Sequence, residues 1–146
     1  MDTLLTTLAA RIALCASGTF FMAGLLTGYW KYQCMKKHPK AEAPFYVNTA
    51  HRAALMYAFA AQLLAVFASL SVFSDRINSF AVGAPILFFG ISILHYVHLG
   101  LTTGSNNSLR DSTNPRKDYL ILNVLSAAEI GGVGVILTGF VLRVAG

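Results

Sequence analysis

Long apolar stretches separated by short polar ones dominate the pattern of this chain. They run from about residue 8 to 30, 49 to 72, 80 to 103 and 119 to 142. A transmembrane helix needs about 20 mostly apolar residues, so each stretch is long enough to cross a bilayer. The stretches lack the sustained alternation of membrane β-strands, and a transmembrane barrel needs about eight strands or more. The pattern therefore predicts an all-α integral membrane protein.

The connections between these stretches are short, which favours antiparallel packing of neighbouring helices. Residues 1–146 are therefore expected to form a single transmembrane domain, a four-helix bundle with up-down topology. Composition agrees with this prediction. The chain is 55% hydrophobic and 12% charged, whereas soluble domains carry about 25% charged residues.

Basic residues are concentrated in the first and third connections, whereas the second contains only Arg76. They are Lys31, Lys36, Lys37 and Lys40 in the first, and Arg110, Arg116 and Lys117 in the third. The positive-inside rule predicts that these two connections face the cytoplasm and that both termini face the opposite side. The rule also accounts for the net charge of +5, so no nucleic-acid partner is predicted.

Small residues recur on several of the predicted helices. They form Gly24-x-x-x-Gly28 in the first stretch, and are dense from Ala50 to Ala65 in the second and from Ala127 to Gly134 in the fourth. Membrane helices associate through such residues because they let backbones approach closely. Their density exceeds what four helices alone require, which favours an oligomer.

The second stretch carries polar residues that need explaining in lipid. His51 and Gln62 fall on one helical stripe with Leu55 and Ala58, so we expect His51 and Gln62 to face inward together. Arg52 points about 100 degrees away from His51. It is either a headgroup-level anchor or part of a site.

The third and fourth stretches contribute further ionisable groups. His95 and His98 share one helix face, and Tyr96 points toward another. Glu129 lies near mid-bilayer and must be protonated, paired or hydrated. Arg11 is one candidate partner for it. The imidazoles and the carboxyl group suit a metal or haem site, interhelical hydrogen bonds or a proton pathway, and HxxH alone is weak support for zinc.

The segment TAHRAALM, residues 49–56, resembles the entry to the second helix in the membrane-associated eicosanoid and glutathione metabolism superfamily, whose members are trimers of four-helix protomers. The chain is also similar to styrene oxide isomerases, a related family of trimeric bacterial membrane proteins. It shares with them a histidine at this entry, His51, a small-residue helix after it, and a tyrosine, Tyr96, at the same separation. Tyr57 and Phe88 replace the family's asparagine and aspartate.

This resemblance implies a homotrimer in a bacterial inner membrane that binds ferric haem b through His51. Tyr96 and Tyr57 would act on the substrate, and Arg52 and Gln62 would contribute to the cofactor site. The implied reaction converts small hydrophobic epoxides to carbonyl compounds by a Lewis-acid (Meinwald-type) rearrangement.

Two alternatives stay open. In the first, the chain is a non-catalytic haem-binding or structural membrane subunit, in which His95 or His98 provides a second iron ligand or no cofactor is present at all. In the second, it is a glutathione transferase-like membrane enzyme in which Arg52 and the arginines of the third connection hold the tripeptide. Ala53 and Met56 replace the asparagine and glutamate of glutathione-using members.

Overall fold

A computed structural model describes residues 6–146 as an assembly of long helices. These are α2 (Leu8–Lys37), α3 (Phe45–Leu70), α4 (Asp75–Thr102) and α5 (Pro115–Ala145). All four are long and apolar enough to cross a membrane, and residues 6–146 contain no strand. The predicted all-α class and the four potential membrane spans are therefore confirmed.

Several helix ends lie beyond the predicted stretches, whereas α3 and α4 end slightly earlier than predicted, at Leu70 and Thr102. The first helix continues to Lys37, where two lysines occupy its last turn and interact favourably with the negative end of the helix dipole. Asn114 caps α5 through its side chain, and a proline occupies the first turn, where the missing N–H costs nothing.

The start of α2 is also capped from another helix. The backbone N–H groups of Leu8 and Ala9 donate to the Asp75 carboxylate at 3.0 and 3.2 Å. These N–H groups have no partner within their own helix, and a carboxylate at a helix N-terminus is favoured by the dipole. Asp75 therefore joins the beginnings of α2 and α4.

Small side chains bring α2 and α3 together along their length. Most buried residues of α3 are alanines, and Gly24 of α2 is buried as well. A Cβ at Gly24 would lie 2.5 Å from Leu55 Cδ2, so any larger residue would require the Leu55 side chain to move. The predicted small-residue contact faces are present in this pair.

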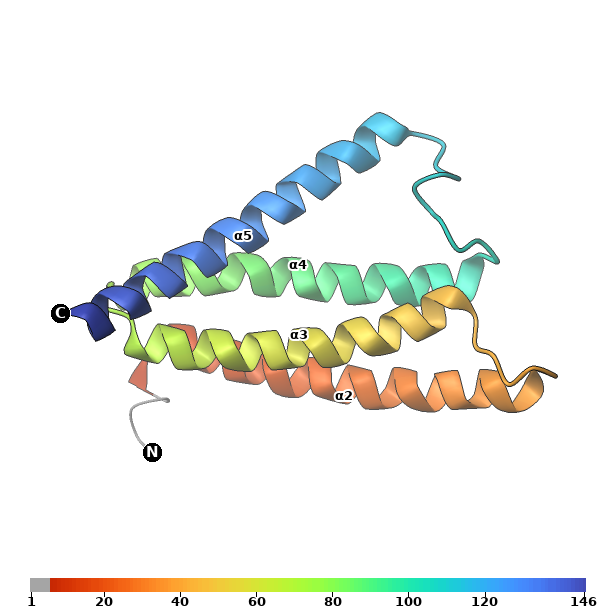
Figure 1. Cartoon of the computed structure of the whole chain (residues 1–146), viewed down its shortest axis with the longest axis horizontal. Helices are drawn as coiled ribbons and strands as arrows, with labels where there is room; N and C mark the ends of the chain where they lie inside the picture. Colours follow the sequence, from red (N-terminus) through yellow and green to blue (C-terminus); the bar gives the residue numbers. More distant parts are fainter. Residues whose placement is uncertain (1–5) are drawn as a thin grey trace.

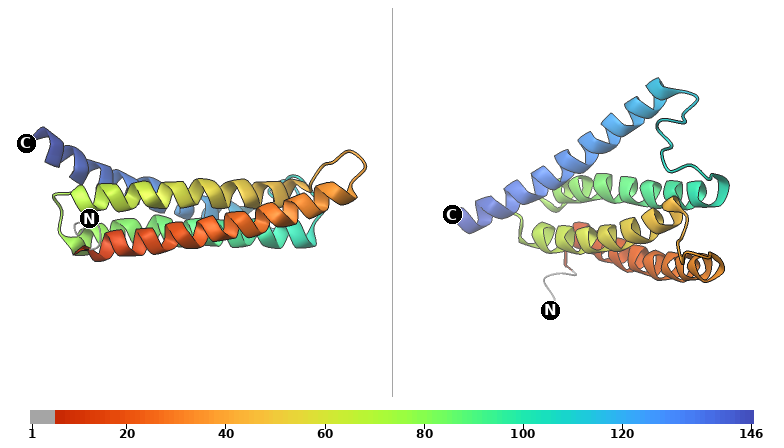
Figure 2. Two further views of the ribbon diagram at one scale, coloured as in Figure 1. Left: turned by 90° about the horizontal axis from the view of Figure 1, so that it is seen from below. Right: turned by 45° about the vertical axis from the view of Figure 1, so that its right-hand side comes forward.

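The last helix is inclined to the other three. Figures 1 and 2 show α2, α3 and α4 side by side, whereas α5 is close to α4 near the C-terminus and diverges toward Pro115. Its buried residues all lie in its second half, at Gly132, Ile136 and Gly139. That half is fastened to the α3–α4 connection by a hydrogen bond from Val72 N to Gly139 O, 3.1 Å long.

Candidate functional site

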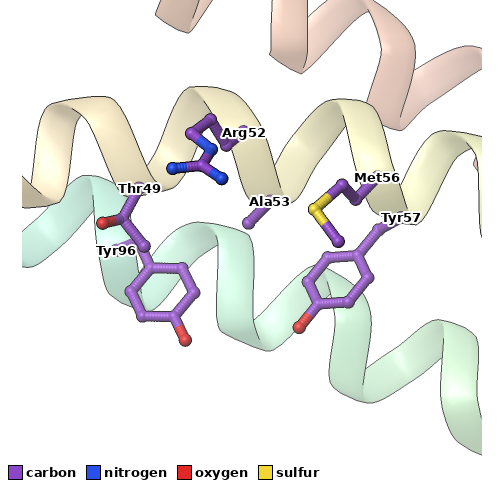
Figure 3. A pocket seen from close by; sticks show the side chains of 6 residues that line it. All are labelled: Thr49, Arg52, Ala53, Met56, Tyr57 and Tyr96. Carbon is purple, nitrogen blue, oxygen red and sulfur yellow. The ribbon is translucent and has the colours of Figure 1, made fainter.

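A cavity of about 230 Å³ lies between α3 and α4, and both elements contribute its polar groups. Figure 3 shows the side chains that line it. They are Thr49, Arg52, Ala53, Met56 and Tyr57 of α3, with Tyr96 of α4. The structure thus brings together three of the predicted site residues: Arg52, Tyr57 and Tyr96.

Aromatic stacking holds both tyrosine rings of the cavity. Tyr57 stacks on Phe89 with ring centroids 4.3 Å apart, and Tyr96 stacks on Tyr46 at 6.3 Å. Phe89 and Tyr46 are buried, so each ring has a fixed support. In Figure 3 both hydroxyl groups lie at the lower ends of their rings, and the two rings are inclined toward each other. A stacked phenol has little rotamer freedom left, so these hydroxyls are preorganised hydrogen-bonding groups.

The Tyr57 hydroxyl belongs to a wider polar cluster that spans three helices. It lies within hydrogen-bonding reach of Ser92 of α4, and interacts electrostatically with Tyr96 and with Glu129 of α5. Ser92 is buried. The Glu129 Oε1 atom is also buried, with no hydrogen-bond partner among residues 6–146. This arrangement connects the inclined helix to the cavity.

His51 lies on a different side of α3, against α2. Its Nδ1 is 2.8 Å from the Gly24 carbonyl oxygen. A carbonyl oxygen only accepts, so Nδ1 carries the proton in the neutral ring and Nε2 keeps its lone pair. A Cβ at Gly28 would lie 2.8 Å from His51 Cε1. Gly24 and Gly28 therefore form a cradle for the imidazole, which we call the His51 cradle.

Gln62 does not share the environment of His51. It is exposed and lies on an apolar groove of about 510 Å³ between α2 and α3. The expectation that both side chains face inward is met in part, since His51 is half-buried and in contact with α2. Leu55 lies one turn from His51 and lines this groove, so the groove adjoins the His51 cradle.

The remaining histidines of the predicted site lie outside the bundle. His95 and His98 are both exposed on α4, and no group of three or more His, Cys, Asp or Glu side chains within residues 6–146 could hold a metal ion. Neither histidine is therefore part of such a metal-binding group in the described part of the chain.

Glu129 has no cationic partner in the described part of the chain, where the ion pair joins Arg110 to Asp111 at 2.8 Å. Arg11, the candidate partner, interacts electrostatically with Asp75 instead. The suggested Arg11–Glu129 pair is therefore wrong. The sequence showed both charges but not their separation, which depends on the tilt of α5.

The connection between α4 and α5 is ordered by its own polar groups. The Asp111 carboxylate accepts hydrogen bonds from Ser105 and from Arg110, and together they lower the pKa of Asp111 to about 2. Ser108 N donates to the Tyr46 hydroxyl at 2.6 Å, and Tyr46 stacks on Tyr96. The loop is therefore linked to the cavity through two aromatic rings.

The sequence had not indicated Ser92 or Tyr46 as parts of the site. Ser92 lies four residues before Tyr96 on α4, a spacing that places both on one helix face, and this is the signal that would have found it. No comparable signal identifies Tyr46. Its role depends on contacts between segments 50 residues apart in sequence, since it joins Tyr96 to the following loop.

Comparisons of the chain with protein-family models, with curated proteins and with solved structures found no match. Its function is therefore inferred from its own residues.

Proposed function

We propose that this chain is a haem b-dependent membrane isomerase that converts small hydrophobic epoxides to carbonyl compounds, with His51 as the iron ligand. The observation that supports this best is the hydrogen bond between His51 Nδ1 and the Gly24 carbonyl oxygen. Histidine ligands commonly donate their second ring N–H to such a group, which fixes the tautomer and raises ligand basicity. His51 Nε2 has no hydrogen-bond partner within residues 6–146.

An apolar groove that begins one helical turn from His51 also supports the proposal. The groove beside the His51 cradle is lined mostly by apolar side chains and extends from Leu55 to Gln62. His51 would hold the iron, and Gln62 would meet the cofactor's edge. When bound, ferric haem supplies a Lewis acid that polarises an epoxide oxygen.

The cavity residues have separate tasks in this proposal. Tyr57 and Tyr96 donate hydrogen bonds to the substrate oxygen from rings that are already fixed, which is the preorganisation that stabilises developing charge. The apolar side chains of Ala53 and Met56 hold the hydrocarbon part of the substrate. They also keep out water that would open the epoxide to a diol. Arg52, exposed beside the cavity, interacts with an anionic edge of the cofactor.

The His51 cradle lies between α2 and α3, whereas the tyrosine cavity lies between α3 and α4. One chain therefore cannot bring His51 and both tyrosines to a single substrate. We propose that the site forms between neighbouring protomers of a homotrimer, with His51 from one and the tyrosines from the next. Many large apolar side chains of α5 are exposed in the single chain, and such a face has room for a neighbour.

We further propose that the helices cross a bacterial inner membrane in alternating directions, with both termini outside the cytoplasm. The support is the basic first and third connections. A cysteine-labelling assay on intact cells tests this. A cysteine introduced into the second connection should react with an impermeant thiol reagent, and a cysteine introduced into the third connection should not.

Visible spectroscopy of the protein purified in detergent tests the haem ligand. A Soret band is expected in the wild type, and His51→Ala should abolish it, whereas His95→Ala and His98→Ala should retain it. A band that survives in His51→Ala contradicts the ligand assignment, and absence of any band in the wild type contradicts the haem proposal. A six-coordinate spectrum that depends on His95 or His98 supports the non-catalytic alternative.

Turnover of styrene oxide, followed by chromatography of the carbonyl product, tests the reaction. Tyr96→Phe and Tyr57→Phe should each lower kcat by about 100-fold, the effect of removing one preorganised donor, while the Soret band persists. Product formation that is unchanged in both variants would contradict the assigned role of the cavity.

A further inference from the structure

A cavity of about 640 Å³ lies between the first turns of α2 and α4, at the other end of α4 from the tyrosine cavity. Figures 1 and 2 show the beginnings of these two helices at the same end of the bundle. The lining side chains are Leu8 and Ile12 of α2 with Asp75, Arg76, Ser79 and Phe80 of α4. Ligand sites have volumes of about 300–1,000 Å³, and the proposed reaction does not use this cavity.

The lining of the cavity changes from charged to apolar along the helices. Asp75 and Arg76 belong to the first turn of α4, and Phe80 follows about one turn later. On α2, Ile12 lies about one turn after Leu8. Because both helices are long and apolar enough to cross a membrane, we expect their first turns at the level of the lipid headgroups and the next turn in the hydrocarbon. A phospholipid has its charged and apolar parts in the same order.

Two arginines make the charged end of the cavity basic. Arg76 lines the cavity, and Arg11 lies three residues after Leu8, which places it beside the cavity face of α2. Both arginines are exposed, and no ion pair within residues 6–146 includes either of them. The Asp75 carboxylate offsets one positive charge, and it already accepts hydrogen bonds from the backbone N–H groups of Leu8 and Ala9. A net positive charge therefore remains at this end.

The bilayer contains a ligand that matches both parts of the cavity. A guanidinium group presents its donors in a fork that fits a phosphate group, and basic pockets between membrane helices bind anionic headgroups. Leu8, Asp75, Arg76 and Phe80 are all exposed, so the cavity opens to the surroundings of the bundle. A free phosphate ion would leave the apolar walls at Ile12 and Phe80 uncovered, whereas a phospholipid would cover them.

We propose that the cavity between α2 and α4 is a binding site for one anionic phospholipid. Arg76, assisted by Arg11, holds the headgroup phosphate, and the first part of an acyl chain lies against Ile12 and Phe80. The lipid connects the beginnings of α2 and α4 beside the hydrogen bonds of Asp75, and so stabilises this end of the bundle. This inference is independent of haem and of the proposed reaction.

Native mass spectrometry of the full chain, freed of lipid in detergent, tests the headgroup preference. Phosphatidylglycerol should bind once per chain, about fivefold more tightly than phosphatidylcholine with the same acyl chains. Arg76→Gln should lower the affinity for phosphatidylglycerol about tenfold, the value of one hydrogen bond to a charged group. Arg143→Gln is the matched control and should leave the affinity unchanged, because Arg143 is exposed at the same end of the bundle but donates to the Leu70 carbonyl oxygen. Equal affinities for the two lipids, or equal effects of the two substitutions, would overturn the proposal.

The apolar walls distinguish a lipid from a free anion and from a second copy of the chain. Ile12→Trp should fill the cavity and lower the affinity for phosphatidylglycerol, whereas Leu94→Trp, at an exposed position of α4 outside the cavity, should not. Inorganic phosphate should not displace the lipid, because it makes no contact with these walls. Displacement by phosphate would show a site for a free anion. An Ile12→Trp variant that loses its oligomer but keeps its lipid would show that another copy covers the cavity. Either result would refute the lipid site.

Discussion

The pair α2 and α3 and the pair α4 and α5 show two ways in which membrane helices meet. In the first pair, glycines and alanines line the contact along its length, and the His51 imidazole fits into a space that Gly24 and Gly28 leave open. In the second, close contact is limited to the half of α5 that contains Gly132 and Gly139, and the other half diverges. In lipid the hydrophobic effect does not drive helices together. The distribution of small residues therefore decides over what length two helices pack closely.

The difference has consequences for the polar side chains between the helices. The tight pair holds His51 with a backbone hydrogen bond, whereas the open pair leaves a Glu129 oxygen buried without a partner among residues 6–146. A fixed group suits a ligand position. A group such as Glu129, on a helix that diverges from its neighbours, changes position when that helix moves.

The largest expected effect is the loss of the His51 cradle in Gly28→Val. A Cβ at this position would lie 2.8 Å from His51 Cε1, and overpacking of this kind costs about 1–3 kcal/mol of unfolding free energy. Chemical unfolding in detergent micelles measures the loss, and the Soret band should fall with it. Gly83→Val on α4 is the control, because no atom lies within 4 Å of its Cβ position and Gly83 does not line the groove between α2 and α3. Equal losses in both variants would show that glycine at 28 makes no special room for His51.

A smaller effect is expected where α5 touches α4. In Gly132→Ala the new Cβ would lie 2.6 Å from Pro85 Cγ, so the helices must separate further at their contact, at a cost of about 1–2 kcal/mol. The neighbouring Gly131→Ala has open space around its Cβ and should gain up to about 1 kcal/mol from helix propensity. Thermal unfolding in micelles compares the two. A destabilising Gly131→Ala would contradict the view that α5 is fastened only along the Gly132 face.

In the connection between α4 and α5 we expect a loss of stability of about the size of one hydrogen bond. Tyr46→Phe removes the acceptor of the Ser108 N–H but retains the ring that stacks on Tyr96. We expect the free energy of unfolding to fall by about 1 kcal/mol and the Ser108 amide to exchange its hydrogen faster. The control is Tyr119→Phe at an exposed position. Unchanged exchange in Tyr46→Phe would show that the loop is held by its internal bonds alone.

The smallest effect is a pH dependence of this loop. Hydrogen bonds from Arg110 and Ser105 lower the pKa of Asp111 from 3.8 to about 2. A lowered pKa means that the contribution to loop order is complete above about pH 4 and is lost as the pH falls toward about 2. Amide exchange of residues 105–111 across this range should reveal the loss, and Asp111→Asn should remove the pH dependence. A midpoint near the ordinary value for aspartate would contradict the assigned hydrogen bonds.

The sequence determined the number and kind of the secondary structure elements. Four apolar stretches of sufficient length permit little besides membrane helices, since backbone groups in lipid must satisfy their hydrogen bonds within the helix. The sequence also identified His51, Tyr57 and Tyr96 as candidates and the glycines of α2 as a contact face. The contact face of α2 follows from local pattern alone, whereas the roles of His51, Tyr57 and Tyr96 are what the resemblance to styrene oxide isomerases implies.

The tertiary structure decided which partner each helix face meets. The helical period relates His51 to Gln62 on one helix, but only packing leaves Gln62 exposed while His51 enters the cradle of Gly24 and Gly28. Packing also gives Arg11 an electrostatic interaction with Asp75 instead of Glu129. The physical reason is that helix spacing and tilt arise from close packing between segments distant in sequence, and a one-dimensional period contains no information about that distance.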